Sequence, residues 1–190
     1  MPRVIVAEDE SIIRMDLVES LAAAGAEVVG QAGDGRTALE LIRSLRPDVA
    51  LLDIQMPELD GLQVAEQILE ERLCAVVMVT AFSQTGLVER AADAGAMGFL
   101  VKPVQPADLL PAIAVARAGF AQLQQLRTSV DELEHQLASR KVIDRAKALL
   151  QERYSMGEAD AFRWLQKAAM DQRTSMRVVA EALLRSTAQK

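Results

Sequence analysis

Several short apolar runs in the first part of the chain end in side chains that can bind a cation or a phosphoryl group. Carboxylates follow two runs, at Glu8, Asp9 and Asp53, while a third run ends at the hydroxyl of Thr80 and a fourth at the ammonium of Lys102. Short, wholly apolar runs are typical of strands buried on both faces of a parallel sheet. Because the carboxyl ends of such strands meet at one rim, where open α/β folds bind ligands, we expect these groups to line one site.

The chemistry of this set points to phosphoryl transfer. Clustered carboxylates repel one another unless a cation lies among them. A hard divalent ion that prefers oxygen ligands meets that need, and Mg²⁺ is the first candidate. One carboxylate can then act as the nucleophile toward phosphorus, since Asp forms aspartyl-phosphates. Lys102 would offset charge on the transferring group, and Thr80 can donate a hydrogen bond to it. The alternative is that each of these side chains is merely a solvated strand end.

Composition and charge indicate a globular chain of two modules. The chain has 190 residues, of which 51% are hydrophobic and 25% charged, enough for one ordinary domain and a small one. Residues 1–119 hold nine basic and 18 acidic side chains, whereas residues 120–190 hold 12 and nine. An acidic first part and a mildly basic second part suggest different partners.

The predicted location is the cytoplasm. No apolar stretch approaches the length of a membrane span, so we expect no membrane association. The first strand begins at the N-terminus and leaves no room for a signal peptide. The single Cys74 cannot form an internal disulfide, which suits a reducing compartment.

Strand-like and helix-like segments alternate through residue 118. We expect strands at 4–7, 28–32, 49–52, 75–79 and 98–101, and helices at 11–25, 37–45, 62–71, 84–95 and from 106 onward. Five β-α units predict an α/β flavodoxin-like fold, a parallel sheet with helices on both faces. The loop 53–61 either is an ordinary turn or presents a backbone carbonyl, that of Gln55, toward a cation.

As a set, these motifs resemble the receiver domain of two-component response regulators. The resemblance rests on Glu8-Asp9, on Asp53 with its loop Met56-Pro57…Gly61, on Thr80-Ala81 and on Lys102-Pro103, and it covers about residues 3–118. It implies that Asp53 accepts phosphate from a sensor histidine kinase. It also implies that Glu8, Asp9, Asp53 and the Gln55 carbonyl bind Mg²⁺, and that Thr80 and Lys102 contact the phosphoryl group.

Two further features follow from this resemblance. The Lys102–Pro103 peptide bond is expected to be cis. Phe99 is expected to move inward with Thr80 on phosphorylation, the alternative being plain packing in the strand. Because the sequence shows no second nucleophile–base constellation, we expect a regulator and not an enzyme, with no catalysis beyond self-phosphorylation and slow dephosphorylation.

From residue 119 the sequence pattern is helical only. Leu123, Leu126, Val130, Leu133 and Leu137 follow heptad spacing. This pattern predicts either a dimerising, coiled-coil-like linker helix over 119–141 or a helix that packs on the chain's own core. The helix is expected to continue to Tyr154, and Ser155 with Glu158 fits a capping box for the next helix.

Two helices after that point would complete a three-helix bundle. The first of them presents an apolar face, and Thr174 or Ser175 is expected to cap the second. The apolar face consists of Ala161, Phe162, Leu165, Ala168 and Ala169. The solvated lone His135 is not expected to bind a metal.

The second module contains three further motifs: Ala146-Lys147-Ala148-Leu149-Leu150, the spacing of Ala159, Phe162, Leu165 and Ala169-Met170, and Val179-Ala180. Over about residues 124–186 they resemble the ANTAR domain, an output module that binds RNA hairpins and prevents transcription termination. RNA contact is implied for Lys147, Arg163, Lys167, Arg173 and Arg177, and Tyr154 or Trp164 can stack on an unpaired base. Ala148 stands where the family often has Gly.

The sequence thus predicts a receiver domain at 1–118 and a linker and ANTAR output region at 119–190. Phosphorylation of Asp53 would favour an output-competent homodimer that binds an RNA hairpin and causes antitermination. One alternative is a DNA-binding transcription factor, because basic helices can form a helix-turn-helix. The other is a protein-interaction switch whose helical tail binds a protein partner.

Overall fold

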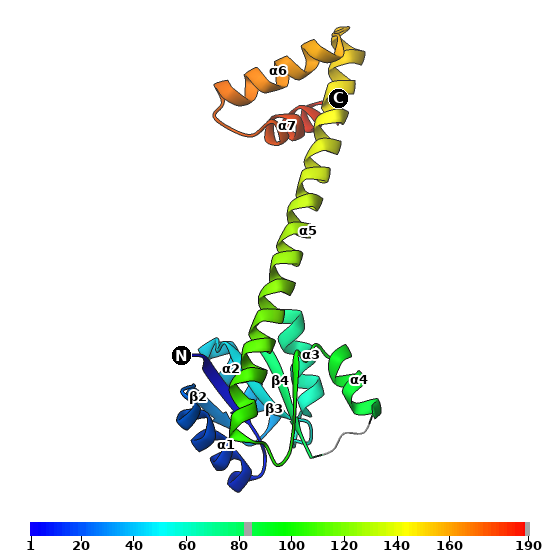
Figure 1. Ribbon diagram of the computed structural model, residues 1–190. Coiled ribbons are helices and arrows are strands. Elements are labelled where there is room, and N and C mark those ends of the chain that lie inside the picture. Colours follow the sequence, from blue (N-terminus) through cyan, green and yellow to red (C-terminus); the bar gives the residue numbers. More distant parts are fainter. Residues whose placement is uncertain (82–84, 189–190) are drawn as a thin grey trace. The chain divides into compact units, whose positions relative to one another are not determined.

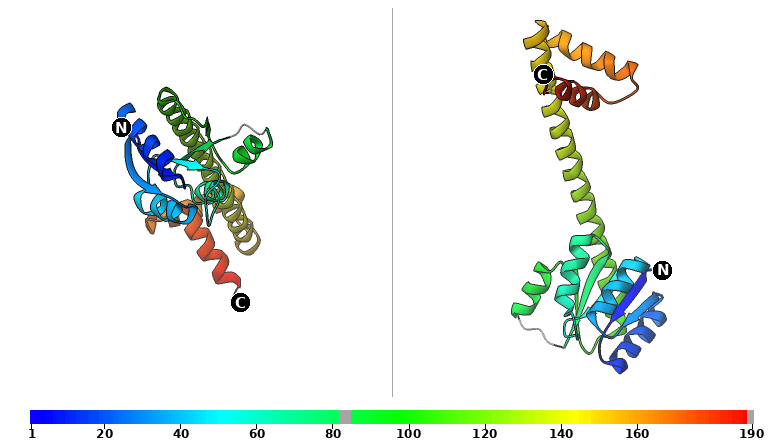
Figure 2. Two further views of the ribbon diagram at one scale, coloured as in Figure 1. Left: turned by 90° about the horizontal axis from the view of Figure 1, so that it is seen from below. Right: turned by 180° about the vertical axis from the view of Figure 1, so that it is seen from behind.

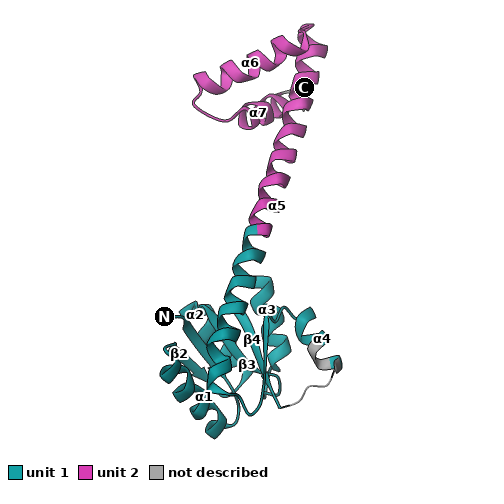
Figure 3. Cartoon of the chain, viewed as in Figure 1, with its two compact units in different colours: residues 1–125 teal, residues 126–190 magenta. Residues whose placement is uncertain are grey.

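The computed structural model describes residues 1–81 and 85–188. It divides into two compact units, residues 1–125 and residues 126–190 (Figure 3). Helix α5 (Pro106–Tyr154) belongs to both, because its first part packs in the first unit and its last part in the second.

The first unit is a five-stranded parallel sheet with helices on both faces (Figures 1 and 2). Its strands are β1 (Arg3–Ala7), β2 (Glu27–Ala32), β3 (Val49–Asp53), β4 (Ala75–Thr80) and β5 (Gly98–Val101), in the order β2-β1-β3-β4-β5. Its helices are α1 (Ser11–Ala24), α2 (Gly35–Leu45), α3 (Gly61–Glu71), α4 (Thr85–Asp93) and the start of α5. This is the predicted flavodoxin-like fold. The predicted start of the fourth helix, Gln84, lies outside the described residues.

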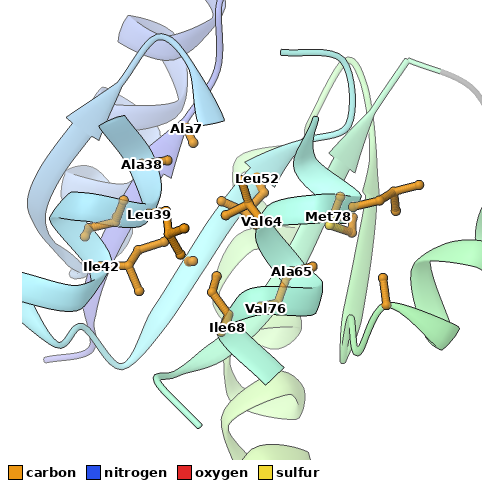
Figure 4. Close-up of a cluster of buried hydrophobic side chains, with 14 of the residues drawn as sticks. Ala7, Ala38, Leu39, Ile42, Leu52, Val64, Ala65, Ile68, Val76 and Met78 are labelled. Atoms are coloured by element: carbon orange, nitrogen blue, oxygen red, sulfur yellow. The ribbon is translucent and has the colours of Figure 1, made fainter. Parts of the chain in front are cut away.

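Alternate residues of the strands feed two separate cores, since successive strand side chains point to opposite faces. On one face, Leu52 and Met78 pack with residues of α2, α3 and α4 such as Ile42 and Ile68 (Figure 4). On the other face, residues such as Leu51 and Val77 pack with α1 and α5, and the buried residues of those helices are Leu17, Leu21, Leu109, Ile113 and Ala116. Burial on both faces explains why the strands read as continuous apolar runs.

Local capping signals determine where several helices begin and end. Helix α1 ends at Gly25, whose φ of 91° is in the left-handed region that favours glycine. Asp34 caps α2 by accepting a hydrogen bond from the Thr37 N–H at 2.7 Å, so this helix begins two residues before the predicted start. Asp60 forms a capping box with Gln63 at the start of α3.

The second unit packs the last part of α5 with α6 (Glu158–Asp171) and α7 (Met176–Ala188). Its buried core consists of Ala146, Leu150, Ala161, Leu165, Ala169, Val179 and Ala180. Ser175 caps α7, as one of the two predicted alternatives, by accepting a hydrogen bond from the Val178 N–H.

Two predictions for this unit are wrong. Ser155 does not cap α6: the cap residue is Gly157, no side chain caps the helix, and Ser155 takes a φ of 50°. The reason is that α5 continues to Tyr154, which leaves Ser155 in the left-handed position that commonly ends a helix. Phe162, predicted to lie on the apolar face, is 41% exposed, because it lies at the edge of the buried stripe, next to Ala161.

The predicted heptad seam on α5 is exposed. Leu126, Val130, Leu133 and Leu137 are each between 53% and 59% exposed. Within the described residues the seam therefore does not pack on the chain's own core, which was one of the two alternatives. No helix in the described part of the chain is both long and apolar enough to cross a membrane.

Candidate phosphoryl-accepting site

The polar residues that follow the strands meet at the carboxyl-terminal edge of the sheet. Glu8 and Asp9 follow β1, Asp53 ends β3, Thr80 ends β4, and Lys102 follows β5, and these four strands are neighbours in the sheet. A cavity of about 900 Å³ opens there. Its lining includes Asp9, Asp53, Gln55, Thr80 and Lys102, together with apolar residues of α1 such as Ile12.

Lys102 lies at the centre of the site and bridges two carboxylates. Its Nζ lies 2.6 Å from Glu8 Oε2 and 2.9 Å from Asp53 Oδ2. Its backbone N–H donates to the Thr80 carbonyl at 2.8 Å, which continues the β4–β5 pairing past the last strand residue. This pairing places the backbone of Lys102 beside the end of β4, and Lys102 and Thr80 both line the cavity. The Lys102–Pro103 peptide bond is cis, as the family resemblance implied.

Burial and charge act in opposite directions on the ionisable groups. Burial raises the pKa of the fully buried Glu8 carboxyl, the hydrogen bond from Lys102 lowers it and the charge of Asp53 raises it, and the net direction is upward. Burial lowers the pKa of the Lys102 ammonium, but hydrogen bonds and charge from Glu8 and Asp53 outweigh burial and raise it. Lys102 is consequently charged at neutral pH.

Backbone contacts hold Asp53 and the loop that follows it. Asp53 Oδ1 accepts a hydrogen bond from the Ile54 N–H at 2.7 Å, and the Gly61 N–H donates to the Ile54 carbonyl at 2.9 Å. A Cβ atom on Gly61 would lie 2.0 Å from the Asp53 carbonyl oxygen, and one on Gly35 would lie 2.1 Å from the Leu59 carbonyl oxygen. Only glycine allows the chain to close this tightly at either position.

The donor set fits a hard divalent cation. Glu8, Asp9 and Asp53 each place a carboxylate oxygen within 4.8 Å of the other two. Glu8 Oε2 is buried and, apart from the Lys102 ammonium 2.6 Å away, has no hydrogen-bond partner among the described residues. Three carboxylates facing one ammonium leave an excess of negative charge, which an ion with oxygen ligands would balance.

One residue beside the acidic cluster was missed by sequence reasoning. The guanidinium of Arg14, on the first turn of α1, donates to the backbone carbonyls of Glu8 and Asp9. No sequence signal marks this contact, because its acceptors are main-chain atoms. Phe99, the predicted switch residue, is half-buried and packs against the core that α2, α3 and α4 cover.

The candidate RNA-contacting side chains of the second unit fall into two groups. Lys147, Arg163 and Arg177 form ion pairs. Lys147 has two acidic partners, Asp144 at 2.9 Å and Glu158 at 3.1 Å, and 17% of its side chain is exposed. Lys167 and Arg173 are exposed and form no ion pair with any described residue. The aromatic candidates Tyr154 and Trp164 are both exposed.

The fold and the site define a response-regulator receiver domain. A family model of the response regulator receiver domain matches residues 4–114, and a model of the ANTAR domain matches residues 131–184. The chain belongs to the response regulator family, with a receiver domain followed by an ANTAR domain.

Known proteins resemble both the whole chain and its receiver part. The transcriptional regulatory protein PdtaR of Mycobacterium tuberculosis is 50% identical over 182 residues, which are 96% of this chain and 89% of that protein. The receiver domain of the putative response regulator NarL from the same species has a TM-score of 0.60 and 38% identity, over 62% of this chain and 97% of its own. A chain of the CheX-CheY-BeF3-Mg²⁺ complex of Borrelia burgdorferi has a TM-score of 0.56 and 27% identity, over 58% of this chain and 85% of its own length.

Proposed function

We propose that Asp53 accepts a phosphoryl group from a sensor histidine kinase and that this controls binding of RNA hairpins by the second unit, with transcription antitermination as the output. The observation that carries the first half is the convergence of Asp53, Lys102 and the acidic pair Glu8-Asp9 at one edge of the sheet, beside a cavity that Asp9, Asp53 and Lys102 line. The second half is supported by the ANTAR match and by the similarity to a transcriptional regulatory protein.

In the phosphotransfer step, a carboxylate oxygen of Asp53 forms a bond to phosphorus as the bond between phosphorus and the donor histidine nitrogen breaks. The Ile54 N–H holds one Asp53 oxygen and so fixes the orientation of the carboxylate. Lys102 and the Thr80 hydroxyl then donate to the oxygens of the new phosphoryl group. Glu8, Asp9, Asp53 and the Gln55 carbonyl would hold Mg²⁺, which supplies positive charge to the phosphoryl oxygens.

The signal would leave the site through Thr80 and Phe99. Once the phosphoryl group is present, Thr80 moves toward it, and Phe99, which packs against the core under α2, α3 and α4, turns inward. The face formed by α4, β5 and α5 then repacks. The solved CheX-CheY complex contains BeF3 and Mg²⁺, which supports the use of beryllofluoride with Mg²⁺ as a phosphoryl mimic here.

The RNA contacts we propose are basic side chains that meet phosphates and an aromatic that stacks on a base. Lys167 and Arg173 are already free of ion pairs with described residues, whereas Arg163 and Arg177 would exchange an acidic partner for a phosphate. Lys147 would have to leave two acidic partners. Trp164 or Tyr154 is exposed and available for stacking on an unpaired base.

We also propose a homodimer through residues 119–141, because the exposed seam has heptad spacing and needs an apolar partner. The regulator would act in the cytoplasm, with no catalysis beyond self-phosphorylation and slow dephosphorylation.

The experiment that tests this function measures RNA binding by the full chain with and without beryllofluoride and Mg²⁺. A fluorescein-labelled RNA hairpin with a randomised loop serves as the probe, and fluorescence anisotropy gives the affinity. We expect binding that strengthens with the mimic and resists competition by duplex DNA. Preference for duplex DNA would favour the DNA-binding alternative, and no RNA affinity even at low salt would favour the protein-interaction switch.

A further inference from the structure

Two cations of the second unit that the family resemblance did not single out are free to bind an anion. Lys141 and Arg145 lie on α5, are exposed, and form no ion pair with any residue among those described. Their neighbour Lys147 differs, because Asp144 and Glu158 neutralise it and only 17% of its side chain is exposed. In this stretch of α5, Lys141 and Arg145 therefore present more unneutralised positive charge to solvent than Lys147 does.

The spacing of the pair concentrates this charge. Residues four apart on a helix lie one above the other, about 6 Å apart along the axis, and like charges in this relation destabilise the helix slightly. The adjacent acid, Asp144, lies 2.9 Å from Lys147 and 4.0 Å from Arg140 and is thus already shared between two cations. On the same face of the helix, the next acids are Glu134 and Glu152, each seven residues from the pair. A bound anion would relieve the repulsion.

Two small side chains lie beside the two cations. Ala138 and Ala148 occupy the same face of α5, and both are exposed. Leu137, one turn before Lys141, belongs to the exposed seam, and between it and Tyr154 none of the large apolar side chains of α5 is exposed. The stretch that holds the two cations thus lacks the large apolar anchor on which protein–protein binding depends. It leaves room for a sugar-phosphate backbone to lie close to the helix, which contact through cations alone requires.

We propose that Lys141 and Arg145 form a phosphate-binding patch on α5 that holds the backbone of the RNA hairpin. The small side chain of Ala148 allows the RNA backbone to approach the helix closely. This inference rests on the proposed RNA-binding function and adds a contact surface to it. The pair binds phosphates of the strand irrespective of base sequence, so it supplies affinity and salt dependence, and recognition of the loop bases remains with other residues.

The test is the salt dependence of hairpin binding by the full chain carrying K141Q and R145Q together. Anisotropy titrations with the fluorescein-labelled, loop-randomised hairpin are repeated across a potassium chloride series. Losing two phosphate contacts should reduce the slope of log affinity against log salt by roughly 1.4 and weaken binding at 0.1 M salt on the order of tenfold to a hundredfold. Circular dichroism checks that the helical content is unchanged.

The matched control is the chain carrying R36Q and R43Q, which loses the same two charges in the first unit and should keep both the affinity and the slope. The variant K141R with R145K, which retains the charges, should also keep the slope. If the parent chain binds the hairpin and the double glutamine variant keeps its slope, the inference is wrong while the proposed function stands. If the parent chain binds no hairpin at low salt, both are wrong.

Discussion

Asp53 is distinguished from the other two carboxylates of the site by how its oxygens are held. One oxygen accepts the Ile54 N–H and the other lies beside Lys102, while the side chain keeps 9% of its surface exposed. Glu8 has no exposed surface and Asp9 is exposed. An oriented carboxylate at the wall of the cavity is the best placed of the three to attack phosphorus.

We therefore expect that Asp53→Asn abolishes labelling of the chain by radioactive acetyl phosphate in the presence of Mg²⁺, because an amide cannot form the acyl phosphate. Autoradiography after gel electrophoresis measures the label. The matched control is Asp93→Asn, at the exposed end of α4, which should label as the parent chain does. Label that persists in the Asp53 variant would show that another residue is the acceptor.

Cys74 is a residue whose ionisation is suppressed by its position. It is buried in the core, and burial raises the pKa of its thiol to about 12. The folded state therefore holds its proton at pH values where the unfolded chain, with a thiol pKa of about 8.5, has lost it. The stability that this provides is complete below that unfolded value and is lost as the pH rises toward 12.

Two measurements check this prediction. A thiol reagent at pH 8 should label the native chain only as fast as the chain unfolds, and should label it at once in guanidinium chloride. In chemical denaturation between pH 9 and pH 11, the parent chain should lose more stability than Cys74→Val does. Fast labelling of the native chain would mean that the thiol is accessible.

At the scale of elements, the loop 54–60 depends on the start of α3. Gly61→Ala would place a Cβ atom 2.0 Å from the Asp53 carbonyl oxygen, so the loop has to shift. We expect a loss of about 1–3 kcal/mol in the free energy of unfolding, measured by urea denaturation, together with slower labelling of Asp53 by acetyl phosphate.

The variant Gly119→Ala, in the interior of α5, is the control for Gly61→Ala. Its Cβ would meet Met97 at 3.9 Å, an ordinary contact, and alanine in the helix interior is favoured over glycine by about 0.5–1 kcal/mol. This variant should be as stable as the parent or slightly more so. Equal stability of the Gly61 variant and the parent would show that the loop is looser than described.

The sheet and the gathering of the site residues could be predicted from the sequence because both follow from strand pattern. An apolar run that ends at Asp53 or Lys102 defines both a buried strand and the rim where it ends. The contacts of Arg14 and Gly61 could not be predicted, because they depend on where main-chain carbonyls lie after folding.

The helical unit was harder to predict in detail than the sheet. Its helices were predictable from their apolar periodicity, but the capping pattern at Ser155 was misleading, since α5 runs to Tyr154 and Gly157 takes the cap position. The ion pairs of Lys147 were also hidden, because Glu158 is eleven residues away and on a different helix. A short-range pattern cannot show which cation a distant acid neutralises.

At the scale of the whole molecule, the proposed function needs a link between phosphorylation and RNA binding, and the exposed seam of α5 is the feature we propose for it. Each of the four large apolar residues of the seam has more than half of its surface exposed to water. A second copy would bury them, and each fully buried leucine contributes about 1.5–3 kcal/mol. If the repacked α4-β5-α5 face favours that pairing, the phosphorylated chain has two RNA-binding units held together, which strengthens binding through effective concentration.

We expect that Leu133→Lys weakens the dimer formed with beryllofluoride and Mg²⁺ by at least a hundredfold, because both copies lose a central apolar contact. Sedimentation equilibrium measures the association constant, and Glu132→Gln, which changes the net charge equally but lies off the seam, should dimerise as the parent does. Lysine is a good helix former, so the monomer should keep its helical content. A Leu133 variant that dimerises as tightly as the parent would place the interface elsewhere. If in addition this variant bound the hairpin with unchanged affinity, dimerisation through the seam would have no part in RNA binding.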